Sequence, residues 1–224
     1  MQIAIGVYPG FAALDAVGPY AVLANLPGAS VVLCAERTGQ LTDEHGQLRV
    51  DIDRTFGDVP APDVLLVPGG LATRRLAAAG TPIVEWIRAA HATTTYTTSV
   101  CTGALLLGAA GLLQGRRATT HWLAYEHLRA HGAEPTEERV VTDGKVVTAA
   151  GVSAGIDLAL VLAGRLGGRE VAQAIQLGIE YDPQPPYDAG SPSKAPSAIR
   201  DLVAGVMAEA EAREVRPGSV PSGS

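Results

Sequence analysis

The sequence predicts an α/β fold in which a mostly parallel central sheet lies between two layers of helices. Short apolar runs with the length of buried strands alternate with runs at helical spacing through most of the 224 residues, and this alternation is typical of parallel sheets covered on both faces. With 47% hydrophobic residues, the chain can bury one sizeable core. We therefore expect a single domain over residues 1–214 and a flexible Pro/Gly/Ser tail over residues 215–224.

Strands and helices are expected to alternate in the following order. Strand composition is found at residues 2–8, 30–35, 63–68 and 93–100. Helical spacing is found at residues 20–26, 76–90 with a break at Thr81-Pro82, the stretch after Cys101, 123–131, 156–166, 168–179 and 197–213. Asp143-Gly144 between β-branched runs predicts a hairpin, and weak alternation over residues 48–52 predicts a shorter one at an edge.

Composition argues against several classes of partner. The net charge of −6 disfavours nucleic acid and anionic membranes, and the most apolar window, residues 104–113, is too short to span a bilayer. Cys34 and Cys101 are too few for a disulfide framework, and no basic-then-apolar signal precedes the first strand, so we expect a cytoplasmic protein. No Cys/His cluster has metal-ligand spacing and no phosphate-binding glycine motif follows a strand, so we expect neither metal nor cofactor.

Cys101 stands where a strand-like run ends and a run at helical spacing begins. Small residues, Ser99 and Gly103, lie two places to either side, which is the pattern of a nucleophile elbow. There a thiolate would face the positive end of the following helix, which favours its charge. Lone cysteines in apolar sequences are otherwise mostly inert core, as we interpret Cys34. This pattern alone leaves both interpretations of Cys101 open.

Candidate site residues follow other expected strands as well. Asp15 lies in the apolar connection after the first strand, where position alone favours a helix N-cap over a functional acid. Gly69 and Gly70 follow the strand at residues 63–68, and they form either an ordinary turn or a backbone that approaches a ligand. Because the carboxyl ends of parallel strands meet at one edge of a sheet, we expect these residues to lie near Cys101. That convergence favours a catalytic cysteine.

Several motifs give the chain a resemblance to the DJ-1/PfpI superfamily. They are Ser99-Val100-Cys101-Thr102-Gly103, Pro68-Gly69-Gly70, Leu14-Asp15-Ala16-Val17-Gly18-Pro19 and the run from Gly111 to Trp122, with further similarity over residues 181–192. The resemblance implies a three-layer sandwich of the class I glutamine amidotransferase type and a homodimer. Within the superfamily the chain is most similar to members that hydrate isocyanides to N-substituted formamides.

This resemblance also implies a role for each residue of the expected site. Cys101 would attack the terminal isocyanide carbon, giving a thioimidate that water hydrolyses. Asp15 would be the acid/base group, its pKa raised by burial. The N–H groups of Gly70 and Thr102 would donate to the developing charge, and the Thr102 hydroxyl would add a hydrogen bond to substrate. Leu14, Val17 and Trp122, beside Gly69, would line an apolar substrate pocket, although such side chains suit a core equally well.

Thr102 distinguishes between branches of the superfamily. Its protease-like and glyoxalase-like members are similar in placing histidine directly after the nucleophile, so the threonine favours the pairing of Cys101 with Asp15. The other candidate base is His121, which we interpret as a structural histidine bonded to backbone. Two alternatives stay open: another superfamily activity (amidase, glyoxalase or redox protein), and a non-catalytic ligand sensor. A proline-rich arm carrying Tyr181 and Tyr187 is the expected dimer contact.

Overall fold

The computed structural model describes residues 1–214, except for the side chains of Ala79 and Glu214. The expected tail at residues 215–224 lies outside the described residues. The described residues divide into two compact units, residues 1–181 and residues 182–214. The expectation of a single domain over residues 1–214 stays a prediction.

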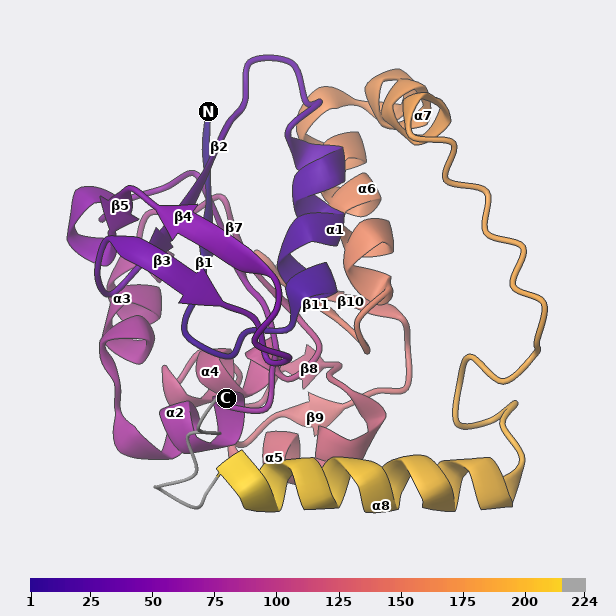
Figure 1. The fold of residues 1–224 in the computed structure, drawn as a ribbon. Helices are drawn as coiled ribbons and strands as arrows, with labels where there is room; N and C mark the ends of the chain where they lie inside the picture. The colour runs from indigo at the N-terminus through magenta and orange to yellow at the C-terminus, as the bar shows by residue number, and fades with distance from the viewer. Residues whose placement is uncertain (215–224) are drawn as a thin grey trace. The chain divides into compact units, whose positions relative to one another are not determined.

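Within the described residues, a seven-stranded sheet forms the middle layer of the first unit (Figure 1). Its strands, in spatial order, are β10 (Val140–Asp143), β11 (Val146–Ala149), β7 (Tyr96–Val100), β6 (Val64–Val67), β1 (Gln2–Gly6), β2 (Ser30–Ala35) and β5 (Arg54–Thr55). All neighbours in this sheet pair in parallel except β10 and β11, which form the hairpin that Asp143-Gly144 predicts. The expected mostly parallel sheet is therefore confirmed.

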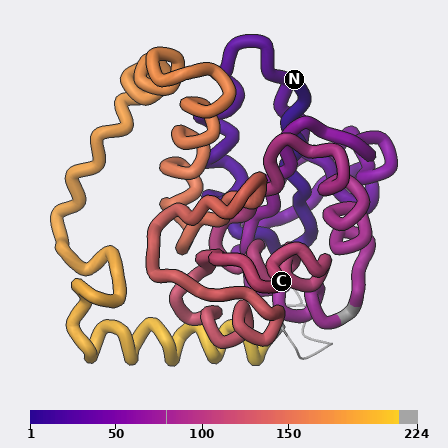
Figure 2. Tube along the Cα trace, turned by 180° about the vertical axis from the view of Figure 1, so that it is seen from behind, coloured from indigo at the N-terminus to yellow at the C-terminus, as the bar shows by residue number. Residues whose placement is uncertain are grey.

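Helices cover both faces of this sheet. On one face α1 (Ala13–Leu23) packs against α6 (Ala154–Gly167), which also packs against α7 (Arg169–Gly178). Figures 1 and 2 both show α1 in indigo beside α6 in orange. On the other face α4 (Gly103–Ala109) packs against α2 (Thr73–Ala79), α3 (Pro82–His91) and α5 (Tyr125–Ala130). Crossovers of one hand produce these two layers, because the chain moves outward from β1 in both directions.

A small hairpin covers the carboxyl end of β1. It consists of β3 (Gly39–Thr42) and β4 (Arg49–Ile52), which pair antiparallel and confirm the predicted edge hairpin. The Gly10 N–H donates to the Thr42 carbonyl oxygen at 3.0 Å, which ties the hairpin to the loop after β1. The remaining short elements of this unit are η1 (Phe56–Asp58), β8 (Arg117–Ala118), η2 (Trp122–Ala124) and β9 (Glu134–Pro135).

Helix α1 begins earlier than the sequence predicts. The expected start was residue 20, whereas the helix begins at Ala13 and contains Pro19. Proline removes one backbone hydrogen bond from a helix, so the sequence pattern predicts a start after Pro19. The N-cap is Ala12, so the interpretation of Asp15 as a cap is wrong. Asp15 lies in the first turn with its carboxyl group turned inward, where it is fully buried.

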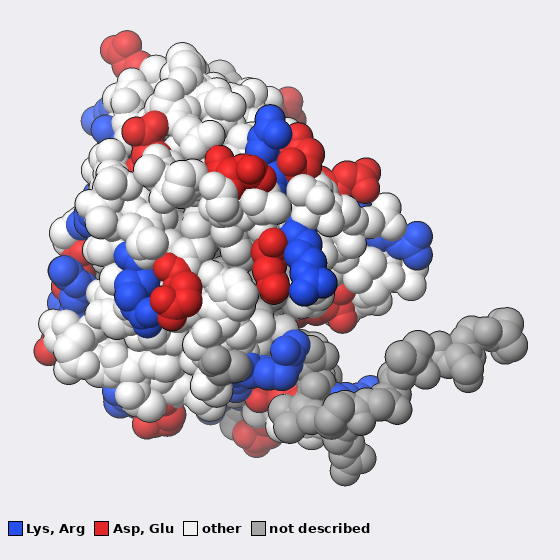
Figure 3. Space-filling model, turned by 90° about the vertical axis from the view of Figure 1, so that its left-hand side faces the viewer, with Lys and Arg blue, Asp and Glu red and all other residues white. Residues whose placement is uncertain are grey.

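The hydrophobic core lies between the sheet and its helices. Its largest fully buried side chains include Phe11, Ile3, Ile5, Leu65, Leu66, Ile87, Leu105 and Leu106. Cys34 is also fully buried, as predicted for a core cysteine. Within residues 1–214, no helix is both long enough and apolar enough to cross a membrane. On the face shown in Figure 3, acidic side chains lie beside basic ones, and neither kind gathers into a broad patch.

The second unit contains one long helix in its described part. This helix, α8 (Ser197–Glu214), confirms the helix predicted over residues 197–213. Residues 182–196 form no strand or helix, as their proline content predicts. Four exposed apolar side chains recur along α8 at helical spacing: Ile199, Leu202, Val203 and Val206. We call these residues the α8 apolar stripe.

Candidate active site

Cys101 occupies a tight turn between β7 and α4. Its φ angle of +56° lies in the left-handed region, which is uncommon for any residue with a Cβ. The Cys101 N–H donates to the carbonyl oxygens of Ala149 at 3.1 Å and Ala150 at 2.9 Å, and its own carbonyl oxygen accepts from the Thr120 hydroxyl at 2.8 Å. These bonds hold the strained turn, so the structure has the elbow geometry that the sequence predicts.

Glycines allow the turns after β6 and β7 to pack backbone against backbone. A Cβ at Gly103 would lie 2.3 Å from the carbonyl oxygen of Val67. A Cβ at Gly69 would lie 2.7 Å from the Thr102 nitrogen and 2.8 Å from Asp15 Oδ2. Real Cβ atoms do not approach other atoms this closely, so side chains at these positions would push the two turns apart. The glycine pair after β6 is therefore part of the site and more than an ordinary turn.

Asp15 faces both turns from the first turn of α1. Its Oδ2 accepts the Gly69 N–H at 2.8 Å, while Oδ1 has no hydrogen-bond partner among the described residues. Burial raises the pKa of Asp15 to about 7, and the Gly69 N–H and the neighbouring Cys101 side chain only partly oppose this rise. At neutral pH the carboxyl group therefore holds a proton about half of the time. The role of Asp15 as the acid/base group stays a prediction.

The Cys101 side chain is buried, with 6% of its surface exposed. Burial raises the pKa of the thiol well above its ordinary value, and the negative charge of Asp15 raises it further. The backbone N–H groups of Val152 and Thr102 favour the thiolate, but they offset only part of this effect. Burial thus opposes the thiolate that the helix after Cys101 is expected to favour, and the activation of Cys101 stays a prediction.

Thr102 and Gly70 bond to each other. The Gly70 N–H donates to the Thr102 hydroxyl oxygen at 3.1 Å, and that hydroxyl lies 3.2 Å from the Gly70 carbonyl oxygen as its donor. Both groups are therefore already paired with each other. Their predicted contacts with substrate stay predictions. The Thr102 N–H is different, because it bonds to the Cys101 sulfur.

The comparisons with known proteins agree with this geometry. The family model described as DJ-1/PfpI family matches residues 1–164. The chain belongs to the DJ-1/PfpI family. A relative named isonitrile hydratase, from Pseudomonas putida, is 47% identical over 201 residues, which are 90% of this chain and 87% of the relative.

Solved structures confirm the DJ-1/PfpI fold. A THiJ/PfpI family protein from Pseudomonas syringae is 40% identical, has a TM-score of 0.87, and covers 95% of this chain and 88% of its own. Drosophila melanogaster DJ-1beta is 19% identical with a TM-score of 0.72, covering 81% of this chain and 98% of its own, and so shares the fold.

This DJ-1/PfpI chain places the three predicted pocket side chains at its surface. Leu14 and Val17 lie on α1 with 44% and 43% of their surfaces exposed. Trp122 is half-buried at the start of η2, where its ring lies 6.0 Å from that of His121. Core packing is therefore excluded for Leu14 and Val17, and the role of all three as substrate contacts stays a prediction.

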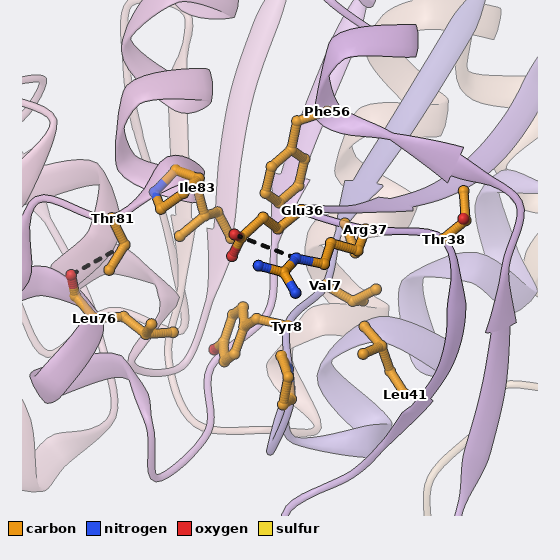
Figure 4. Close-up of a pocket in the computed structure, with 13 residues that line it drawn as sticks. Val7, Tyr8, Glu36, Arg37, Thr38, Leu41, Phe56, Leu76, Thr81 and Ile83 are labelled. Atoms are coloured by element: carbon orange, nitrogen blue, oxygen red, sulfur yellow. Dashed lines mark hydrogen bonds and ion pairs between the residues drawn. The ribbon is translucent and has the colours of Figure 1, made fainter.

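A separate apolar cavity of about 410 Å³ lies beyond the carboxyl ends of β1 and β2 (Figure 4). Its apolar walls include Val7, Tyr8, Leu41, Phe56, Leu76 and Ile83, and Glu36 and Arg37 are also among the lining residues. Tyr8 is the link to the active site, because its hydroxyl donates to the Pro68 carbonyl oxygen at 2.8 Å. Its phenol also lies close enough to Asp15 and Cys101 for their charges to raise its pKa.

His121 is bonded to backbone, as predicted. Its Nδ1 accepts the Leu123 N–H at 3.4 Å and so caps η2, and its ring lies against Gly151. Burial and the charge of Arg74 lower the pKa of the imidazole, so the ring is neutral at physiological pH. Within the described residues, no group of three or more His, Cys, Asp or Glu side chains is arranged to hold a metal ion.

Sequence reasoning missed Tyr8, Glu44 and Val152. Tyr8 and Val152 each follow a strand of the sheet, so the strand-end rule that found Asp15 and Cys101 applies to them as well. Val152 has a φ angle of +31°, which directs its N–H toward the Cys101 sulfur and which no sequence pattern of a β-branched residue predicts. Glu44 comes from the turn of the β3–β4 hairpin, and neither spacing nor strand order indicates that it reaches the site.

Proposed function

We propose that this chain hydrates isocyanides, R–N≡C, to N-substituted formamides, with Cys101 as the nucleophile. The observation that carries the proposal is the buried pair formed by the Cys101 thiol and the Asp15 carboxyl group. It lies in a chain that is 47% identical, over 90% of its length, to an isonitrile hydratase. The reaction must deliver a proton to the isocyanide carbon, and a carboxyl group that is partly protonated at neutral pH can donate it.

In the first step the thiol adds across the terminal carbon. Asp15 gives its carboxyl proton to that carbon, the Cys101 sulfur forms a bond to the same carbon, and the thiol proton passes to the carboxylate. The product is the thioimidate R–N=CH–S–Cys101, and Asp15 ends the step protonated again. Because the two proton transfers compensate, no free thiolate has to exist in the buried pocket.

In the second step water replaces sulfur. Asp15 protonates the thioimidate nitrogen, and its carboxylate then takes a proton from the water that attacks the carbon. The adduct R–NH–CH(OH)–S–Cys101 collapses to R–NH–CHO, and the hydroxyl proton returns to sulfur to restore the thiol. The N–H groups of Thr102 and Val152 lie at the sulfur, where they stabilise the charge that develops as the C–S bond breaks.

The proposal also covers the compartment, the oligomeric state and the partners of the enzyme. We expect a cytoplasmic homodimer that acts on a small molecule, without a metal, cofactor, nucleic acid or membrane partner. Tyr187, with 81% of its surface exposed, and the α8 apolar stripe support a contact with a second copy, since monomers rarely expose many large apolar side chains. In such a dimer Leu14 and Val17 are candidates to line a pocket that a partner completes.

A turnover assay tests the proposal. Purified protein is incubated with cyclohexyl isocyanide, and the formamide is followed by NMR. We expect steady formamide production by the wild type and a loss of at least about 1,000-fold in Cys101→Ala, since the nucleophile is removed. Intact-protein mass spectrometry of the wild type during turnover should show an adduct of the substrate's mass on Cys101. Consumption of methylglyoxal with no action on the isocyanide would replace the proposal by a glyoxalase activity.

A further inference from the structure

A second carboxyl group, that of Glu44, belongs to the surroundings of the active site. Glu44 lies in the turn of the β3–β4 hairpin, and its N–H donates to the Phe11 carbonyl oxygen at 3.0 Å. The adjacent residue, Asp43, forms a β-bridge with Phe11, and Asp43 Oδ1 accepts the N–H of Leu48 at 3.1 Å. This turn is therefore fixed to the loop between β1 and α1, the loop that leads to Asp15.

The Glu44 side chain points inward from this turn. It is 22% exposed, and its carboxylate accepts the N–H of Leu71, the residue directly after the Gly69-Gly70 pair. Its charge acts on Asp15, Cys101 and Tyr8. Glu44 thus faces the two reacting groups from the hairpin, while Gly69 faces them from the end of β6.

Of the two carboxyl groups, Asp15 is the one that more readily holds a proton. Asp15 is fully buried, whereas Glu44 reaches water, accepts the Leu71 N–H and lies 3.9 Å from His45 Nε2. Burial and the charge of Asp43 raise the pKa of Glu44, but His45 and the Leu71 N–H oppose this rise. The more complete burial of Asp15 favours its neutral form more strongly. The other titratable groups that act on these two carboxyl groups are Cys101 at Asp15, and Asp43 and His45 at Glu44. His45 is the one of these that can be positive, and it lies on the solvent side of Glu44, with 79% of its side chain exposed.

We propose that Glu44 is a positioning residue whose negative charge adds to burial in holding the proton on Asp15, so that Asp15 can serve as the proton donor in isocyanide hydration. This inference rests on the proposed function for its consequence, but the protonation of Asp15 can be measured without turnover. The sequence around Glu44 gives no sign of such a role, because the residue lies in a polar turn far along the chain from Cys101.

Removal of this charge has a calculable effect. A unit charge close to a buried carboxyl group shifts the pKa of that group by about one unit. If the pKa of Asp15 falls from about 7 by that amount, the protonated fraction at pH 7 falls from about one half to about one tenth. We therefore expect kcat/KM to fall about fivefold at pH 7 and to stay nearly unchanged at pH 5, where Asp15 is protonated in both proteins.

The experiment compares Glu44→Gln with a matched control, Glu126→Gln. Both variants lose one carboxylate, but Glu126 lies on α5 with 83% of its side chain exposed, away from the site. Two measurements are made from pH 5 to 9: kcat/KM for cyclohexyl isocyanide, and the side-chain ¹³C resonances of ¹³C-labelled aspartate, in which the Asp15 signal is assigned with Asp15→Asn. In Glu44→Gln both titrations should move down by about one pH unit, while Glu126→Gln should match the wild type.

A third variant separates charge from structure. Glu44→Asp keeps the charge on a shorter side chain, so the Asp15 resonance should titrate at nearly the wild-type pH. Thermal unfolding of both variants shows whether either substitution disturbs the hairpin. The inference is overturned if the Asp15 resonance titrates at the same pH in Glu44→Gln as in the wild type, or if Glu44→Asp and Glu44→Gln shift it equally. Because the resonance needs no substrate, a protein inactive toward isocyanides would still decide the role of Glu44.

Discussion

Burial determines the protonation of both reacting residues. Asp15 and Cys101 lie together in a space from which water is largely excluded, so each retains the proton that it would more readily lose in solution. In sites with a Cys-His pair, the imidazolium stabilises a thiolate. Here Thr102 follows the cysteine, and the neighbouring carboxyl group makes a thiolate still less favourable. A resting thiol beside a carboxylic acid suits an addition in which protons and bonds move together.

The buried carboxyl group should also make stability depend on pH. The pKa of Asp15 rises from 3.8 to about 7 on folding, so the folded state binds the proton more tightly than the unfolded state. The contribution of this group to the free energy of unfolding is therefore fully present below about pH 4, and it is lost as the pH rises through about 7. Between pH 5 and pH 8 the loss amounts to about 3 kcal/mol.

Asp15→Asn removes this titration while keeping a similar shape. Urea unfolding of both proteins at pH 5, 6, 7 and 8 should show the variant gaining stability over the wild type by about 3 kcal/mol across the series. A difference between the two proteins that stays constant with pH would show that Asp15 does not carry a raised pKa in the folded state.

At the scale of secondary structure, strand ends supply most of the site. The alternation of strands and helices predicted the sheet and its layers, and it brought Asp15, Gly69 and Cys101 to one edge, because parallel strands share the direction of their ends. The start of α1 was wrong because Pro19 interrupts the helical pattern without ending the helix. Glu44 was missed for a different reason, since its place depends on how a hairpin folds over the sheet, and no local pattern contains that information.

The close contact between the turns after β6 and β7 can be tested with one methyl group. In Gly69→Ala the new Cβ would lie within 2.8 Å of Thr102 and of Asp15 Oδ2, so the turns must separate. We expect a loss of roughly 1–3 kcal/mol in the free energy of unfolding and a large loss of turnover. The control is Gly178→Ala on α7, where no atom lies within 4 Å of the added carbon. Equal stability of the two variants in urea would refute the contact.

Large apolar side chains are exposed in both described units of the chain. Leu14, Val17 and Tyr20 are exposed on α1 of the first unit, and the α8 apolar stripe is exposed in the second. Burial of such surfaces contributes about 25 cal/mol for each Å² removed from water. A second copy of the chain is therefore the partner that we propose for both surfaces.

Sedimentation equilibrium at micromolar concentration tests this assembly. The wild type should have about twice the 23.0 kDa mass of one chain. A charge in the α8 apolar stripe, Leu202→Glu, should shift the mass toward the monomer, because an unpaired carboxylate buried in an apolar interface costs several kcal/mol. Leu177→Glu on α7 is the control, since Leu177 is exposed but lies outside the stripe. A monomeric wild type would disprove the dimer. A dimeric Leu202→Glu variant would show that the interface does not include the α8 apolar stripe.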